Sequence, residues 1–201
     1  MAYILAFDTT GDAGSIALAK GESLIEEVPV AATEGFGHVL FEEIETLLAR
    51  HQLTLREIAC FATASGPGSF TGVRIGLTAA KGLAEATGRQ VVAVSNLQAL
   101  AWFGHGDLRA PYLDARRGEV YGAVYDAQLQ LVQPEVVAKL ENWTAGLPPG
   151  AQAYTQQAPL ARAIAQIAWQ RYEAGLGQDA ADVDANYVRR ADAELMWRDR
   201  D

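Results

Sequence analysis

The sequence contains 201 residues, of which 50% are hydrophobic and 20% are charged. This composition supplies a packed core for one large domain or two small ones and excludes a disordered chain. The net charge is −9, from 25 acidic residues against 16 lysines and arginines, so we expect no tight, autonomous binding to DNA or RNA. Because it has no basic leader and no run of 18 apolar residues, we expect a cytoplasmic protein without signal peptide or membrane contact.

The first half of the chain alternates between strand and helix patterns. Apolar or alternating runs over residues 3–7, 15–19 and 24–30, separated by glycine-containing turns, predict three antiparallel strands. The later patterns predict a helix over 38–50, a buried strand over 58–64, a helix over 71–87, a strand over 91–94 and a short helix reaching 103. The order βββαβαβα makes the later strands parallel to the first, so we expect a mixed α/β sheet with helices on its faces.

The second half begins by repeating this opening. An apolar run over 110–114 ends in Asp114, as the first strand ends in Asp8, and two more strand patterns follow it. We interpret this as an internal duplication of the fold, with subdomains over 1–108 and 109–201. The second copy is predicted to be shortened, with strands over 119–125 and 129–137, a loop over 142–157, one helix over 158–174 and an extended stretch near 186–188.

Two strand–aspartate–turn units that face each other form the phosphate cradle of actin-like and sugar-kinase-like ATPases. In such a cradle Asp8 positions a metal-bound phosphate, and Thr9, Thr10 and the amide of Gly11 bond its oxygens. The alternative is that Asp8 and Asp114 only cap turns through their own side chains, as aspartate often does. The shortened second copy also leaves little chain for a loop that would hold a purine.

Other catalytic chemistries find little support. His38, His51 and His105 lack the spacing of a metal site, so we expect no metal and interpret them as solvated or capping residues. Cys60 lies within an apolar strand pattern, where burial makes a thiol inert. The sequence has no Gly-x-Ser-x-Gly elbow, and the glycine-rich turn before residue 72 fits neither a Walker loop nor a dinucleotide turn.

The helix predicted over 71–87 has an unusually wide apolar surface. Its polar residues form one narrow stripe, which leaves an apolar arc of roughly 220°, about twice what one sheet needs. The stripe consists of Arg74, Thr78, Lys81 and Glu85, and small residues recur within the arc at Gly72, Gly76, Ala80 and Ala84. Glycine inside a helix costs about 0.5–1 kcal/mol, so we infer that this helix packs on its own sheet with one side and closely on a second helix with the other. The second helix is the helix over 38–50, a partner's helix, or both.

The most specific runs in the sequence are Gly66-Pro67-Gly68-Ser69-Phe70-Thr71-Gly72-Val73-Arg74-Ile75-Gly76 and Leu113-Asp114-Ala115-Arg116-Arg117-Gly118-Glu119-Val120-Tyr121. Shorter runs are Ile4-Leu5-Ala6-Phe7-Asp8-Thr9-Thr10, Gly37-His38, Lys81-Gly82-Leu83-Ala84, Val94-Ser95-Asn96-Leu97 and Tyr187-Val188-Arg189. Together they resemble the TsaB family of bacterial tRNA threonylcarbamoyladenosine biosynthesis proteins. The resemblance spans nearly the whole chain, with a second half shorter than is usual for the family.

This resemblance implies an actin-like (ribonuclease H-like) fold and a non-catalytic role in modifying the adenosine beside the anticodon of tRNA. It implies three partners, namely a TsaD-like catalytic subunit, a TsaE-like ATPase and a second copy of the chain, with tRNA reached only through the complex. The interface is expected on the two N-terminal helices, at Leu40, Ile44, Gly72, Val73, Gly76, Leu77, Ala80 and Ala84. The catalytic relative carries a His-x-x-x-His metal pair where this sequence has Asn96 and Leu100, and leucine cannot bind a metal.

Two hypotheses stay open at the level of the sequence. The first is a scaffold subunit with a vestigial phosphate loop, whose assembly Gly76→Arg or Ala80→Arg should block. The second is a small actin-fold ATPase or phosphotransferase that uses Asp8 and Asp114, which Mg-ATP binding lost in Asp8→Ala would support. We expect no firmly bound cofactor, and the sequence leaves open whether ATP or ADP sits at the subunit junction.

Overall fold

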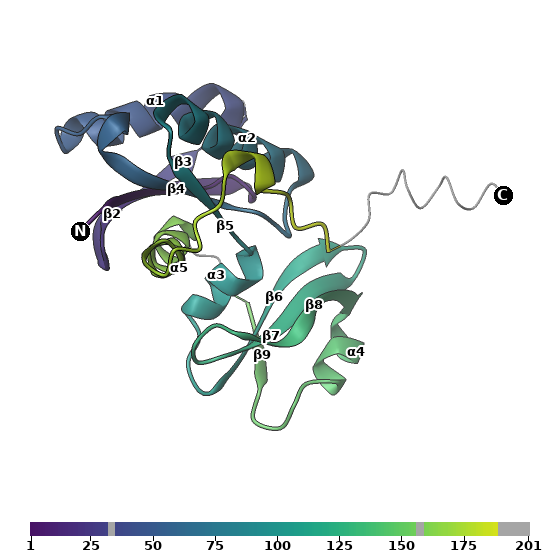
Figure 1. The fold of residues 1–201 in the computed structure, drawn as a ribbon. Helices are drawn as coiled ribbons and strands as arrows, with labels where there is room; N and C mark the ends of the chain where they lie inside the picture. Colours follow the sequence, from purple (N-terminus) through teal and green to yellow (C-terminus); the bar gives the residue numbers. More distant parts are fainter. Residues whose placement is uncertain (32–34, 156–158, 189–201) are drawn as a thin grey trace.

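The computed structural model describes residues 1–31, 35–155 and 159–188. Arg189 of the last matching run lies outside these residues. The strands form two sheets, one from each half of the sequence (Figure 1). Within the described ranges, no helix is long and apolar enough to cross a membrane.

The first sheet has five strands in the order β3-β2-β1-β4-β5. Its strands are β1 (Tyr3–Asp8), β2 (Ala13–Lys20), β3 (Ser23–Ala31), β4 (Ile58–Ala64) and β5 (Gln90–Val94). β1, β2 and β3 pair antiparallel, whereas β4 pairs parallel with both β1 and β5. The predicted mixed sheet is therefore confirmed.

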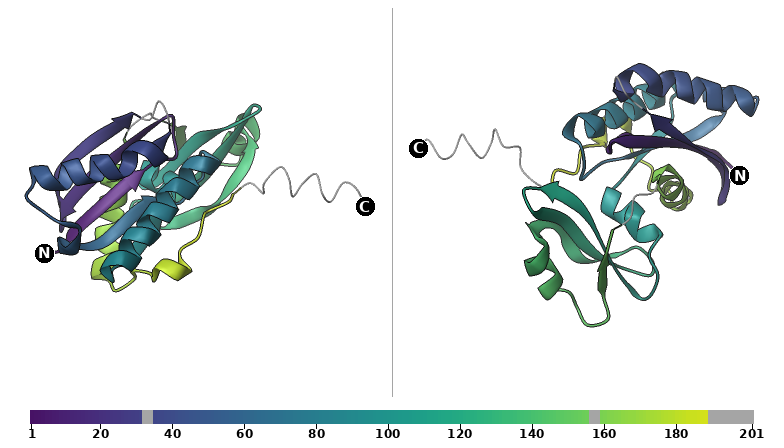
Figure 2. Two further views of the ribbon diagram at one scale, coloured as in Figure 1. Left: turned by 90° about the horizontal axis from the view of Figure 1, so that it is seen from above. Right: turned by 180° about the vertical axis from the view of Figure 1, so that it is seen from behind.

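Helices cover both faces of this sheet. α1 (Phe36–Arg50) and α2 (Phe70–Thr87) lie side by side on the outer face, and α5 (Ala161–Glu173) lies on the inner face (Figures 1 and 2). Because side chains alternate along a strand, Leu5 and Phe7 of β1 pack in the core beneath α1 and α2. Ile4 and Ala6 pack in the other core, with α5, so β1 is buried on both sides from Ile4 onward.

The second sheet repeats the strand order of the first. Its order is β8-β7-β6-β9, with β6 (Leu108–Arg116), β7 (Glu119–Asp126) and β8 (Leu131–Lys139) antiparallel and β9 (Gln152–Tyr154) parallel to β6. α3 (Asn96–Trp102) packs against β6 and connects the two halves. One meander followed by a parallel strand thus occurs twice, which is the duplicated actin-like fold that the sequence predicts.

One expectation for the second half is wrong. The predicted loop over 142–157 contains β9 and most of α4 (Leu140–Ala145), because Trp143 of α4 is buried against Gly122 of β7. This tertiary contact leaves no periodic pattern in the sequence. The stretch near 186–188, predicted only as extended, belongs to no sheet, and the backbone N–H of Asn186 donates to Ser65 O at 2.8 Å.

The chain returns to the first sheet after β9. α5 packs against β1, β2 and β4, the backbone of Gln178 bridges Val91 of β5, and the 3-10 turn η2 (Ala180–Asp182) packs on α2. Segments predicted to belong to 109–201 therefore complete the core of the first half. The division of the chain into subdomains at residue 108 stays a prediction.

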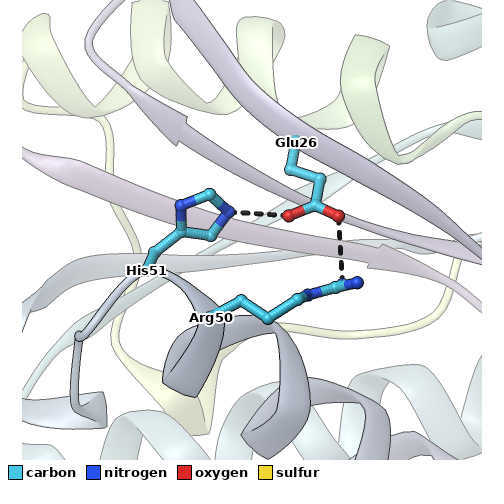
Figure 3. A network of polar contacts seen from close by, with 3 residues as sticks. All are labelled: Glu26, Arg50 and His51. Atoms are coloured by element: carbon cyan, nitrogen blue, oxygen red, sulfur yellow. Dashed lines mark hydrogen bonds and ion pairs between the residues drawn. The ribbon is translucent and has the colours of Figure 1, made fainter.

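The C-terminal end of α1 is fixed to the edge strand β3 by a small ionic network (Figure 3). Glu26 of β3 bonds His51 Nε2 at 2.7 Å and forms an ion pair with Arg50 Nη2 at 3.1 Å. The backbone N–H of His51 also caps α1 by donating to Leu48 O at 3.1 Å. His51 is thus a capping residue, one of the two roles that its spacing predicts.

Candidate functional site

A cavity of about 640 Å³ lies between the two sheets. The β1–β2 turn, the β4–α2 loop, α3, the β6–β7 hairpin and the residues before α5 all contribute to its lining. The structure brings Asp8, Thr10, Gly11 and Asp114 together in this lining, as the repeated strand–aspartate–turn pattern predicts. Thr9 is not part of it, because Thr9 is buried and its hydroxyl donates to Gly72 O of α2 at 2.7 Å.

Asp8 is a buried carboxylate that closes its own turn. Its Oδ1 accepts hydrogen bonds from the backbone N–H of Thr10 at 2.8 Å and from the Thr10 hydroxyl at 2.6 Å. Burial raises the pKa of Asp8 above its ordinary value, and the two hydrogen bonds from Thr10 oppose that rise. This geometry corresponds to the turn-capping alternative.

Asn96 extends this network across the cavity floor. Its Nδ2 donates to the Thr10 hydroxyl, and its Oδ1 accepts from the backbone N–H of Gly66 at 2.9 Å. Leu100, one helical turn later, lines the cavity and is otherwise packed in the core. The resemblance places the His-x-x-x-His metal ligands of the catalytic relative at these two positions. In this chain they are a hydrogen-bonded amide, Asn96, and an apolar side chain, Leu100.

Asp114 lies on the opposite wall and also stabilises its own turn. Its Oδ1 accepts from the backbone N–H of Arg116 at 2.8 Å, and its side chain is exposed. Arg116 and Arg117 have left-handed backbones, with φ of 65° and 56°, in the β6–β7 hairpin. Arg116 lines the cavity, a role that its place in a basic pair does not reveal.

The charge balance of the cavity is unfavourable to a free polyphosphate. Three carboxylates line it, from Asp8, Asp12 and Asp114, whereas Arg116 is the one lysine or arginine in the described lining. Like charges a few ångströms apart repel strongly away from bulk water, so a phosphate chain would need additional cations here. The described lining thus has the position of a phosphate cradle, and its charge disfavours a phosphate chain that arrives without a metal ion.

Metal and thiol chemistry have no visible basis in the described residues. No group of three or more His, Cys, Asp or Glu side chains there could hold a metal ion. Cys60 is fully buried in β4, and burial raises the pKa of its thiol to about 12. The predicted burial of this thiol is therefore confirmed, and its inertness stays a prediction.

The residues expected at a partner interface are buried within the chain itself. This applies to all eight, namely Leu40, Ile44, Gly72, Val73, Gly76, Leu77, Ala80 and Ala84. A Cβ atom at Gly72 would lie 1.9 Å from Thr9 O, and one at Gly76 would lie 2.6 Å from Thr63 Oγ1. Gly72 and Gly76 therefore serve close packing of α2 on its own sheet, which is one side of the predicted packing. On the other side α2 lies beside α1 and shares a core with it, and packing on a partner's helix stays a prediction.

Other residues form the exposed surface of α1 and α2. Phe41 of α1 is 54% exposed, and Thr78 and Gly82 of α2 face solvent, with nothing within 4 Å of a Cβ at Gly82. At the start of α2, Phe70 is 47% exposed beside Arg74. Sequence reasoning missed Phe41 and Phe70, because each lies next to the apolar stripe of its helix.

A carboxylate outside the cavity joins three segments. Glu135 of β8 accepts hydrogen bonds from the hydroxyl of Ser95, from the Tyr125 hydroxyl at 2.6 Å and from Asn186 Nδ2 at 2.6 Å. Burial, and after it the charge of Glu135, raises the pKa of Tyr125. Glu135 thereby links the second sheet to the N-terminus of α3 and to the C-terminal segment.

Comparison with known proteins relates this architecture to one group. The family model of TsaD, tRNA N6-adenosine threonylcarbamoyltransferase, matches residues 26–183. The tRNA threonylcarbamoyladenosine biosynthesis protein TsaB of Bacillus subtilis is 36% identical over 145 residues, which cover 70% of this chain and 63% of that protein. TsaB of Escherichia coli is 36% identical over 126 residues, which cover 61% of this chain and 54% of that protein. The chain thus spans little more than half the length of these relatives.

Solved structures agree with the sequence matches. YeaZ from Pseudomonas aeruginosa superposes with a TM-score of 0.80 and 26% identity, covering 93% of this chain and all of that one. A Pseudomonas aeruginosa protein described as uncharacterized, with similarity to the peptidase YeaZ, gives 0.82 and 27%, covering 94% of this chain and all of that one. The family model, the sequence matches and the shared fold together show that the chain belongs to the TsaB family, within the group that the TsaD model describes.

Proposed function

We propose that this chain is a non-catalytic subunit in the threonylcarbamoylation of the tRNA adenosine beside the anticodon. It acts by pairing with a TsaD-like catalytic subunit, joined by a TsaE-like ATPase, and tRNA is bound by the complex rather than by this chain alone. Membership of the TsaB family and the net charge of −9 support this assignment.

The floor of the cavity carries the proposal. Leu100 offers no ligand atom, and both polar atoms of the Asn96 side chain are used within the fold. Asn96 and Leu100 therefore cannot bind the metal ion that a His-x-x-x-His pair at these two positions would bind. In the proposed function the chemistry comes from another subunit, and this chain contributes a surface.

We assign that surface to the exposed face of α1 and α2, centred on Phe41, Thr78 and Gly82. This face carries an exposed large apolar side chain and points away from the second sheet, so a partner can reach it (Figure 1). The same face would serve a second copy of the chain, which makes self-association a competitor of assembly with the catalytic subunit. Because the eight residues expected from the sequence are buried, they would support this surface from beneath rather than touch the partner.

The test is reconstitution of tRNA threonylcarbamoylation from purified TsaD-like and TsaE-like subunits of the same organism, with and without this chain. We expect threonylcarbamoyl incorporation only when the chain is present, and loss of that stimulation for Phe41→Glu. Leu131→Glu is the matched control, since Leu131 is also 54% exposed but lies on β8 of the other sheet. Equal incorporation without the chain would refute the proposal.

The alternative is a small ATPase that uses Asp8 and Asp114. One observation favours it, because both carboxylates line the same cavity. Calorimetry with Mg-ATP and the isolated chain separates the two functions. Micromolar binding that Asp8→Ala abolishes would support the ATPase, whereas no heat of binding supports the scaffold subunit.

A further inference from the structure

An aromatic and cationic cluster lies on the surface where α2 begins. The guanidinium carbon of Arg74 lies 3.9 Å from the ring centroid of Phe70, which precedes it by one helical turn. Arg74 Nε donates to the Tyr187 hydroxyl at 3.3 Å, and the rings of Phe70 and Tyr187 are 5.6 Å apart. All three side chains are exposed, with Phe70 at 47% and Tyr187 at 48%.

Tyr187 is held in this cluster by the rest of the fold. The neighbouring Asn186 is fixed twice, by its backbone N–H to Ser65 O at 2.8 Å and by its side chain to Glu135 at 2.6 Å. Tyr187 therefore reaches Arg74 from a fixed backbone, although the two residues are 113 positions apart in the sequence. An arginine stacked on one ring and bonded to another loses little further side-chain entropy when it binds an anion.

The two terminal nitrogens of Arg74 donate no hydrogen bond to a residue that the structure describes. Its Nε is the one nitrogen with a hydrogen-bond acceptor among the residues that the structure describes. The two terminal nitrogens, Nη1 and Nη2, are thus left with the parallel geometry that binds both oxygens of a carboxylate. The few residues that contribute most of the binding energy in protein–protein interfaces are often arginines and aromatic residues, and this cluster contains both.

We propose that Arg74 is an anchor residue that binds an aspartate or glutamate carboxylate of the partner protein, with Phe70 and Tyr187 packed around that contact. The inference rests on the proposed function, since it names a contact for the same α1–α2 surface. A protein carboxylate is preferred to an RNA phosphate for two reasons. The described cluster supplies one cation framed by two apolar rings, and phosphate backbones are bound by several clustered cations on a basic surface.

The experiment measures the affinity of the full-length chain for the purified TsaD-like subunit of the same organism by calorimetry. Arg74→Ala should weaken binding by about 30-fold, as expected for an anchor residue. Arg74→Lys should recover only part of this loss, because lysine keeps the charge but not the planar fork. Arg89→Ala is the matched control, since Arg89 is an exposed arginine just beyond the other end of α2. Binding is compared only among variants whose urea unfolding midpoint and circular dichroism spectrum equal those of wild type.

Each outcome has a distinct meaning. A set of Asp→Ala and Glu→Ala variants of the TsaD-like subunit should contain one whose effect on binding disappears in the Arg74→Ala background, which identifies the carboxylate. If wild type binds and Arg74→Ala binds within about twofold of it, the anchor is refuted and the proposed function stands. If Arg74→Ala reduces binding of the complex to tRNA but not of the two proteins to each other, the phosphate is the ligand and the inference is wrong. If the wild-type chain does not bind the TsaD-like subunit, the proposed function fails, and the anchor fails with it.

Discussion

Replacing Gly72 with alanine should destabilise the fold, whereas the same replacement at Gly82 should stabilise it. Both glycines lie in α2, so both substitutions gain the same helix propensity, about 0.5–1 kcal/mol. They differ only in what the new methyl group meets. At Gly72 it meets backbone atoms, with Thr9 O at 1.9 Å and Thr9 C at 2.9 Å, and at Gly82 it meets nothing within 4 Å.

The magnitude at Gly72 follows from these distances. The helix must move from the β1–β2 turn by about 1 Å to restore an ordinary contact, and overpacking of this kind costs about 1–3 kcal/mol. The same movement stretches the hydrogen bond from the Thr9 hydroxyl to Gly72 O, which is worth about 1 kcal/mol. Set against the gain in helix propensity, Gly72→Ala should lower the free energy of unfolding by about 2 kcal/mol. Gly76→Ala should fall between the two, since its methyl group meets side-chain hydroxyls that can rotate.

Urea denaturation followed by circular dichroism measures all three variants against wild type. From least to most stable, we expect Gly72→Ala, Gly76→Ala, wild type and Gly82→Ala. If Gly72→Ala unfolds at the wild-type urea concentration, α2 does not approach the β1–β2 turn as closely as described. If Gly72→Ala instead keeps full stability and loses only partner binding, the glycine stripe is a docking face, and the packing argument is wrong.

Three further predictions concern ionisable groups. Asp8→Asn should be more stable than wild type at pH 7, because both hydrogen bonds from Thr10 go to one oxygen that asparagine retains. Burial raises the pKa of Asp8 in the folded protein above its ordinary value of 3.8. Protonated Asp8 therefore stabilises the wild-type fold below pH 3.8, and this stabilisation is lost as the pH rises through the folded pKa. The advantage of Asp8→Asn in urea titrations should vanish near pH 3, and an advantage that does not change with pH would contradict the prediction. Glu135→Ala should lower the free energy of unfolding by on the order of 1–3 kcal/mol, because three donors lose their acceptor, and an unchanged urea midpoint would show that water replaces the carboxylate. Cys60 should not react with a thiol reagent at pH 8 until the chain unfolds, because burial raises its pKa to about 12, and fast labelling of the native protein would contradict this.

The first sheet could be predicted because its signals are local. Alternating and apolar runs separated by glycine turns define β1, β2 and β3, and Gly88, with a left-handed φ of 64°, ends α2 where the pattern requires it. α4 and β9 were not predictable in this way. The burial of Trp143 against Gly122 fixes α4, and no repeat in its own six residues announces that contact.

The helix periodicity of α2 was correct, and the structure adds which neighbour each of its small residues meets. A stripe of small residues indicates that something approaches closely, and it does not distinguish a helix from a sheet. Gly72 and Gly82 illustrate this, because both are glycines in one helix and only Gly72 faces a backbone within contact distance. Counting glycines therefore overestimates the surface left for a partner, and the exposed positions between them are the ones that a partner can touch.

The cavity shows a different limit of sequence reasoning. The repeat of a strand ending in aspartate correctly predicts that Asp8 and Asp114 face one cavity, because duplicated units place equivalent turns at equivalent positions. It does not predict their role, since capping a turn and positioning a phosphate both require an aspartate followed by polar or glycine residues. The facts that bear on the role are non-local: the amide of Asn96 engages the Thr10 hydroxyl, and in the described lining one arginine accompanies three carboxylates. This balance disfavours a phosphate chain without its metal ion, so the titration of Mg-ATP into wild type and Asp8→Ala is the measurement that separates the two roles.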